Sequence, residues 1–387
     1  MAKGAASFES RGSSYEKQNR QPLQVFVTRY SRLADPCLWP LQNVELPWIM
    51  SMSRLVAVLV VFSVTLLSGC DDSKNRLSVL SGPTMGTTWS VKFSGTPKEG
   101  VDDLKADIEA ALEQVNAEMS TYRPESDLSR FNAADAGTLM ALPADTVKVL
   151  SAAFAISSMT DGAYDVTVGP LVNLWGFGPD PDRFEPPSED EITAAMARVG
   201  WQQLLLNDNE LLQPGDVYVD LSSIAKGFAV DKVAELLESQ GLKNYLVEVG
   251  GELRGSGKKP YGQPWRVAVE RPIAGVREVE KVVALTDMAV ATSGDYRNFF
   301  ESDGQLYSHT LDPRTGYPVN HTLASVSVLH ESAMMADGLS TAMTVLGPEA
   351  GMAFAKQHEL AVFFIVRKGE GVEELSTPAF DAILEEK

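Results

Sequence analysis

Hydrophobic residues recur every three or four positions from Val101 to Met119, which is the spacing of one face of an amphipathic helix. Similar patterns follow along the chain, and local signals mark several helix ends. Ser188 begins a capping-box sequence, and Gly241 and Gly347 stand where a helical pattern stops. The predicted helices cover residues 101–119, 144–160, 188–200, 224–240, 333–346 and 348–358.

Short runs of alternating or continuous hydrophobic residues predict strands between these helices. The predicted strands cover residues 217–221, 245–249, 265–270, 282–285, 306–311, 324–329 and 361–367. Strands and helices are intermixed without a regular βαβ alternation, so we expect an α+β fold with mixed β-sheets flanked by helices. The region 83–370 contains no clear linker and is expected to form one domain, followed by a C-terminal tail at 371–387.

The first part of the chain has the pattern of a targeting segment. The apolar run 55–67 follows Arg54 and is too short to span a bilayer comfortably, which is typical of a secretory signal peptide. Leu67-Ser68-Gly69-Cys70 then resembles a bacterial lipobox. We therefore expect a lipoprotein signal peptide at 50–69, lipidation of Cys70 and a polar tether at 70–82. The alternative is a buried strand or helix that ends at a cysteine by chance.

Residues 1–49 do not fit a signal peptide and are interpreted as an N-terminal extension that arises from a misplaced start codon. Asp71 and Asp72 resemble the inner-membrane retention signal of enterobacterial lipoproteins. The expected location is therefore the bacterial inner membrane, with the protein lipid-anchored and facing the periplasm.

Composition and charge narrow the function classes. The chain has 52 acidic and 33 basic residues and a formal net charge of −19, which argues against nucleic acid as the main partner. Its two cysteines, Cys37 and Cys70, both lie in the first fifth of the chain, which excludes a cysteine-ligated zinc site from the main domain. Walker, zincin, α/β-hydrolase and Rossmann motifs are absent.

Polar clusters punctuated by glycine remain as candidate chemistry. In the segment 220–227, Lys226 and backbone N–H groups meet at a predicted helix N-terminus, which favours a phosphate; an ordinary serine N-cap is the equally weighted alternative. The paired glycines of Glu248-Val249-Gly250-Gly251-Glu252 interrupt a predicted strand and indicate a bulge or close approach of a ligand.

Two further clusters offer a base and a cation site. His309 lies between polar loops and is a candidate base, although a lone histidine is more often structural. Asp337, Ser340 and Thr341 share one helix face, and their oxygens suit Mg²⁺. The alternative for this cluster is a first helical turn with Asp337 near the positive end of the helix dipole.

These clusters, in this order, resemble the FAD:protein FMN transferase family (ApbE flavin transferases) over about residues 83–370. The most specific segments are Asp165–Gly178, Asp220–Gly227, Ala291–Asn298 and His309–Gly316. The resemblance implies a tunnelling-fold-like core and a reaction in which the FMN part of FAD moves to a threonine hydroxyl of an acceptor protein, with release of AMP. Implied acceptors are flavin-bearing subunits of the Na⁺-pumping NADH:quinone reductase and the Rnf complex.

The resemblance also implies a set of site residues. The FAD site is implied at Met85, Tyr122, Ala163, Tyr164, Asp165, Asp220, Lys226 and Leu311. Mg²⁺ is implied at the backbone carbonyl of Ser223 and the side chains of Asp337 and Thr341, with Ser340 as a further ligand where some members have Asp.

We expect His309 to be the general base, because a threonine hydroxyl is a poor nucleophile at neutral pH and needs a group that takes its proton. Two alternatives to the transferase stay open: a Mg²⁺-dependent FAD pyrophosphatase that yields FMN and AMP, and a non-catalytic flavin-binding lipoprotein.

Overall fold

The computed structural model describes residues 76–178, 185–270, 272, 279–294, 299–302, 305–369 and 371–385. The chain divides into two compact units, residues 1–68 and 69–387, and every described residue belongs to the second. The predicted extension and signal peptide, Cys70, and the segment 295–298 lie outside the described residues. Among the helices that are described, none has the length and apolar character needed to cross a membrane.

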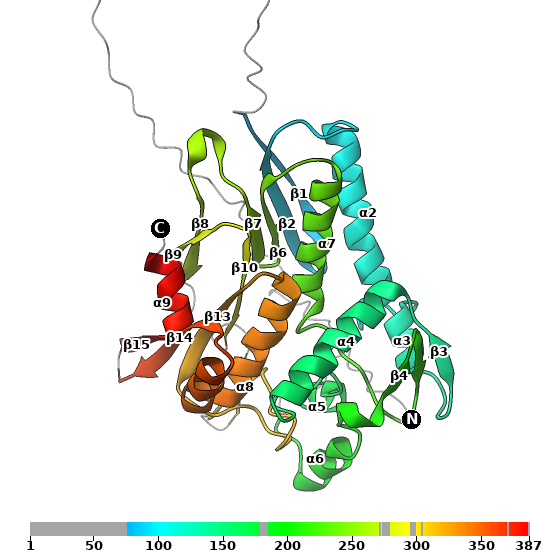
Figure 1. Ribbon diagram of the computed structural model, residues 1–387. Helices are drawn as coiled ribbons and strands as arrows, with labels where there is room; N and C mark the ends of the chain where they lie inside the picture. Colours follow the sequence, from blue (N-terminus) through cyan, green and yellow to red (C-terminus); the bar gives the residue numbers. More distant parts are fainter. Residues whose placement is uncertain are drawn as a thin grey trace, which may run out of the picture. The chain divides into compact units, whose positions relative to one another are not determined.

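An eight-stranded sheet forms the centre of the second unit (Figure 1). Its neighbouring strands pair antiparallel throughout. In spatial order the strands are β1 (Leu77–Thr84), β2 (Thr87–Ser94), β6 (Asn244–Val249), β7 (Glu252–Ser256), β10 (Met288–Gly294), β13 (Leu323–His330), β14 (Ala361–Lys368) and β15 (Gly371–Ser376).

Both faces of the sheet are buried. Successive side chains of a strand point to opposite sides, so each central strand contributes to two cores. Val326 and Phe364 pack into the larger core, whereas Leu329 and Phe363 pack into a second core. The larger core includes residues of the long helices α2 (Val101–Met119), α4 (Ala144–Met159), α7 (Ala225–Ser239) and α8 (Ala333–Gln357). The hairpin of β8 (Trp265–Glu270) and β9 (Val279–Leu285) covers the second core together with α9 (Pro378–Glu385).

Short elements complete the fold. They are α3 (Asp127–Asn132), β3 (Leu139–Ala141), α5 (Gly169–Leu174), α6 (Glu189–Met196), β4 (Leu205–Asn207), β5 (Glu210–Leu212), β11 (Phe299–Ser302) and β12 (Gln305–Ser308), with two 3₁₀ turns at Trp201–Gln203 and Pro260–Gly262. A small third core joins α5, α6 and Leu311, and the Trp175 indole N–H donates to the Gly316 carbonyl at 2.9 Å. The segment after β12 is thereby fixed against α5.

The α+β class predicted from the sequence is confirmed. The helix predicted at 101–119 has the predicted bounds, and those predicted at 144–160, 188–200 and 224–240 are present with shifted ends. The break predicted at Gly347 is a kink inside α8, where the glycine takes φ 75° ahead of Pro348.

Three predictions need correction. Residues 217–221 belong to no strand of the described chain, because the Asn132 side-chain amide bonds both the N–H and the carbonyl of Val219, each at 2.8 Å. The strand predicted at 306–311 ends at Ser308, so His309 follows it. The fold also extends beyond its expected limits, since β1 starts inside the expected tether and β15 and α9 occupy the expected tail.

Candidate active site

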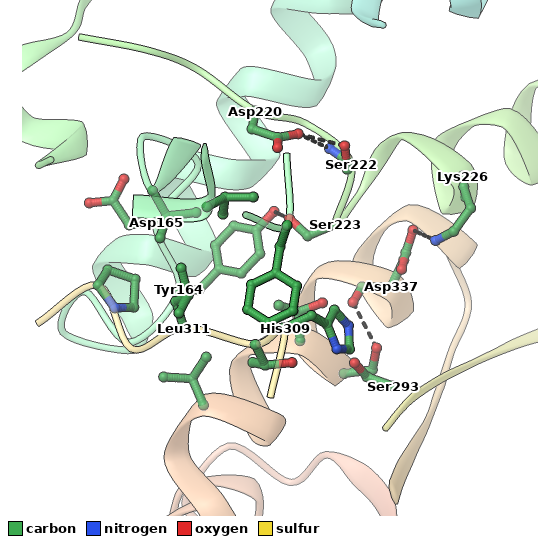
Figure 2. A pocket seen from close by; sticks show the side chains of 18 of the residues that line it. Tyr164, Asp165, Asp220, Ser222, Ser223, Lys226, Ser293, His309, Leu311 and Asp337 are labelled. Atoms are coloured by element: carbon green, nitrogen blue, oxygen red, sulfur yellow. Dashed lines mark hydrogen bonds and ion pairs between the residues drawn. The ribbon is translucent and has the colours of Figure 1, made fainter. Parts of the chain in front are cut away.

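One pocket of about 780 Å³ brings together segments far apart in the sequence (Figure 2). Its volume lies in the range typical of sites for cofactor-sized ligands. The lining includes twelve of the thirteen site residues that the sequence predicted within the described chain: Tyr122, Ala163, Tyr164, Asp165, Asp220, Ser223, Lys226, His309, Leu311, Asp337, Ser340 and Thr341.

The loop between α4 and α5 forms one wall of this pocket, and buried Asp165 holds the loop in shape. Its Oδ1 accepts from the N–H of Thr167 at 2.8 Å and the hydroxyl of Thr167 at 2.6 Å, and its Oδ2 accepts from the N–H of Trp201 at 3.0 Å. Burial raises the pKa of Asp165 in spite of these hydrogen bonds. The Asp165 carboxylate therefore fixes the shape of the loop, and its role in FAD binding stays a prediction.

A second wall is the turn that leads into α7. Asp220 Oδ1 accepts from the N–H of Ser222 at 2.8 Å and the hydroxyl of Ser222 at 2.6 Å, which closes the turn. Ser223 donates its hydroxyl to the Tyr164 phenol oxygen at 2.9 Å. Burial raises the pKa of the Tyr164 phenol, so this ring stays neutral and ties the two walls together.

Close packing of α7 on α8 places the charged groups. A Cβ on Gly227 would lie 2.3 Å from the Ala333 carbonyl oxygen and 2.7 Å from the Asp337 Cβ, so only glycine allows this approach. Asp231, one turn further along α7, accepts from Ser332 and from the N–H groups of Ala333 and Met334 at 2.6 to 3.0 Å. It thereby caps the start of α8.

Asp337 is a buried acid of the site, with 4% of its surface exposed. Its Oδ2 accepts from the Gly227 N–H at 2.9 Å and lies 3.6 Å from the Lys226 Nζ. Burial raises the pKa of Asp337 to about 7, against the opposing effect of Lys226. Burial alone would lower the pKa of Lys226, but the carboxylates of Asp337 and Glu252 outweigh it, so the ammonium stays charged.

His309 lies in the middle of the pocket in Figure 2, between the Tyr164 wall and Asp337. It is half-buried, and the Phe177 ring meets it edge-on with 6.4 Å between ring centroids. Leu311 is buried beside it and forms a bridge with Pro318. The imidazole is therefore presented to the pocket by a segment that is fixed on both sides.

The oxygen atoms of the site fit a magnesium ion. In the part of the chain that the structure describes, no three His, Cys, Asp or Glu side chains gather closely enough to hold a metal. A cation at Asp337 would therefore complete its shell with neutral oxygens, such as Thr341 and the Ser223 carbonyl, and with phosphate or water. Mg²⁺ prefers one or two carboxylates with such partners. The buried Asp337 carboxylate supplies the charge that this cation needs.

Two predicted residues stand apart from the rest. Met85, at the tip of the β1–β2 turn, lines a neighbouring hollow and is not in the pocket lining, so its role in FAD binding stays a prediction. The Ser340 hydroxyl donates to the Asp337 carbonyl at 2.8 Å and is therefore engaged within α8. Glu252 also lines the pocket and contacts Lys226, and the sequence predicted no role for it; the paired glycines before it mark the turn but not this contact.

Comparison with known proteins decides the family. The model of the ApbE family matches residues 85–364. The chain belongs to the ApbE family. The FAD:protein FMN transferase of Vibrio cholerae is 45% identical over 326 residues, covering 83% of this chain and 97% of that protein. The FAD:protein FMN transferase of Haemophilus influenzae is 43% identical over 345 residues, covering 87% and 100%.

Solved structures agree with this ApbE-family assignment. The apo form of the Pseudomonas stutzeri flavinyl transferase ApbE matches with a TM-score of 0.74 and 45% identity, over 80% of this chain and 96% of that one. The Vibrio cholerae flavin transferase ApbE matches with a TM-score of 0.74 and 44% identity, over 79% and 99%. The pocket thus lies in a fold shared with flavin transferases over almost their whole length.

Proposed function

We propose that this ApbE-family protein is an FAD:protein FMN transferase, which moves the FMN part of FAD to an acceptor protein. The observation that carries the proposal is one pocket that gathers twelve predicted site residues, in a chain similar to named FMN transferases over nearly their full length. The pocket has the size for a nucleotide and offers both aromatic walls and a cationic side chain.

The acceptor group is a threonine hydroxyl. Its oxygen attacks the phosphorus on the FMN side of the FAD pyrophosphate, the bridging phosphorus–oxygen bond breaks, and AMP leaves with the electron pair. The products are a phosphoester of FMN with threonine, AMP and one proton. Lys226, whose ammonium stays charged in the pocket, is placed to hold a phosphate oxygen.

Mg²⁺ would be held by Asp337, Thr341 and the carbonyl of Ser223, and it would supply charge stabilisation to the pyrophosphate and the leaving AMP. The protein needs such a cation, because Glu252 and Asp337 already offset the Lys226 charge. The Gly227 N–H and the α7–α8 contact hold Asp337 at the position this role requires.

His309 takes the proton of the threonine hydroxyl as the new bond forms. It is the histidine that lines the pocket, and the segment from Ser308 to Leu311 that presents it is mostly buried. A base of this kind is worth about 10²–10⁴-fold in rate.

The protein acts in the periplasm, anchored to the inner membrane through a lipid on Cys70. The sequence around Cys70 supports this location, which suits acceptors such as subunits of the Na⁺-pumping NADH:quinone reductase and the Rnf complex. Palmitate labelling that disappears in Cys70→Ala, with release into the soluble periplasm, is the expected result; membrane association that persists in this variant contradicts the anchor.

Incubation with FAD, MgCl₂ and a periplasmic extract, followed by in-gel flavin fluorescence, tests the activity. A fluorescent acceptor band that requires wild-type protein is the expected result, with Asp337→Ala as the inactive control. Free FMN and AMP without a band favour the FAD pyrophosphatase. Retained flavin without turnover favours a flavin-binding lipoprotein.

A further inference from the structure

The Lys226 ammonium lies between two buried carboxylates at unequal distances. Its Nζ is 2.7 Å from Glu252 Oε1 and 3.6 Å from Asp337 Oδ2. Glu252 and Asp337 are 5% and 4% exposed, so neither acid is well solvated. Glu252 therefore lies at hydrogen-bonding distance from the Lys226 ammonium, whereas Asp337 forms a looser ion pair with the same group.

The turn between β6 and β7 is shaped around the Lys226 side chain. Gly250 has φ 61°, and a Cβ there would lie 3.1 Å from the Lys226 Cδ, so the aliphatic stem of the lysine passes directly over this glycine. Two hydrogen bonds fix the turn: the Gly250 N–H donates to the Thr88 carbonyl at 3.0 Å, and the Gly251 N–H donates to Glu248 at 3.1 Å. The position of Glu252 relative to α7 is fixed as a result.

We propose that Glu252 is a positioning residue, which holds the Lys226 ammonium away from Asp337 and so keeps the Asp337 carboxylate available to a divalent cation. The inference rests on the proposed function, because it concerns the metal of that same pocket. Without the Glu252 charge, the ammonium would close on Asp337, and a divalent cation would have to displace it. With Glu252 in place, Lys226 stays beside the cation site and presents its other N–H groups to a phosphate.

Direct metal binding tests this role without relying on turnover. Mn²⁺ titration of the full chain without FAD, followed by electron paramagnetic resonance, gives the dissociation constant for wild type and Glu252→Gln. Loss of one charged hydrogen-bond partner is expected to weaken Mn²⁺ binding about tenfold. In assays with FAD, the Mg²⁺ concentration for half-maximal rate should rise by a similar factor.

Glu248→Gln is the matched control, since it removes the same charge from the same turn. Glu248 accepts from the Ser90 hydroxyl and the Gly251 N–H rather than from Lys226, and a glutamine oxygen can still accept the Gly251 N–H that fixes the turn. Its Mn²⁺ affinity should stay within about twofold of wild type, because a charge farther from the cation site is screened. In the double variant Glu252→Gln, Lys226→Met, the competing ammonium is gone, and the affinity should return toward the wild-type value.

Each outcome decides the question. Wild-type Mn²⁺ binding with unchanged affinity in Glu252→Gln overturns the role of Glu252 alone, whereas a wild-type protein that binds no Mn²⁺ overturns the metal site and this inference together. Where Glu252→Gln does not fold, Lys226→Met carries the test. It should bind Mn²⁺ at least as tightly as wild type, and weaker binding contradicts the proposal.

Discussion

Side chains of the pocket divide into those that shape its loops and those left for chemistry. Asp165 accepts two hydrogen bonds from Thr167 of its own loop and one from the N–H of Trp201, and Asp220 accepts two from Ser222. Both contacts of the Asp337 carboxylate fall on Oδ2, which leaves Oδ1 as the atom for a cation. Replacement of Asp337, and of His309 as the proposed base, is therefore expected to change the reaction.

Replacing His309 separates base catalysis from positioning. His309→Asn should lower the single-turnover rate of flavin transfer about 10²–10⁴-fold while FAD affinity stays nearly unchanged. The wild-type rate should rise with pH through an apparent pKa near the usual imidazole value of about 6.5, and the variant should lose this rise. A folded variant with the wild-type pH profile would assign the base elsewhere and leave His309 a structural residue.

Replacing Asp337 separates metal-dependent chemistry from flavin binding. Asp337→Ala removes the one carboxylate of the proposed ligand set, so Mg²⁺-dependent turnover should fall far more than FAD affinity, which flavin fluorescence measures. The walls that contain Tyr164 and Tyr122 are untouched by this change. Turnover within about threefold of wild type at limiting Mg²⁺ would show the metal assignment to be wrong.

Helices and strands with a regular spacing of buried hydrophobic residues could be predicted from the sequence. Val101–Met119 and Trp265–Glu270 have the predicted bounds, because hydrophobic spacing reports which face of an element is buried. The pattern does not report what bonds the backbone. Residues 217–221 alternate like a strand, yet their partner is the side chain of Asn132, 87 residues before Val219.

In the site, too, contacts between distant segments could not be predicted from the sequence. His309 and Asp337 could be proposed from short motifs, because their residue types suit a base and a metal ligand. The role of Glu252 depends on where β7 meets α7, and no local pattern around Glu252 indicates its contact with Lys226. Met85 was expected beside FAD from its place in a motif, but the β1–β2 turn places it in a neighbouring hollow.

The α7–α8 contact predicts the effect of one added methyl group. Gly227→Ala should destabilise the protein by about 1–3 kcal/mol, because the new Cβ would overlap the Ala333 carbonyl and press on Asp337. Denaturant unfolding measures the loss, and the Mg²⁺ requirement should rise with it. Gly371→Ala is the control, since a Cβ there meets only the Lys368 carbonyl oxygen, at 3.8 Å. Equal stability of the two variants would contradict the close approach.

At the scale of the whole molecule, the stability of the fold depends on pH through a buried acid outside the pocket, Glu118. Glu118 of α2 is buried against α4. Its carboxylate accepts from the Thr146 hydroxyl of α4 at 3.3 Å and from the Gln114 side-chain amide of its own helix at 2.7 Å. Burial raises the pKa of Glu118, and nearby Asp145 adds to the shift. The folded protein therefore holds this proton more tightly than the unfolded chain does, and ionisation of Glu118 destabilises the fold.

The pH dependence of stability follows from this sign. The stabilisation is fully present below the unfolded pKa of about 4.3 and is lost as pH rises through the raised folded value. The Tm of wild type should thus fall relative to that of Glu118→Gln as pH rises from 4 toward 7. Arg123 lowers the pKa of Glu113 on the same helix, so Glu113→Gln should show a smaller difference of opposite sign. Parallel curves of Tm against pH for wild type and Glu118→Gln would contradict the raised pKa of Glu118.

Helices, loops and sheet ends of the fold all contribute side chains to one pocket, from Tyr122 to Val345. Its proposed purpose is to join FMN to a protein hydroxyl rather than to water. The most direct measurement is the intact mass of a purified acceptor protein after incubation with this protein, FAD and MgCl₂, together with the AMP released. Covalent transfer predicts an acceptor heavier by FMN less one water, modified on a threonine, with an equal amount of AMP. An acceptor of unchanged mass, with free FMN and AMP accumulating in solution, would contradict it.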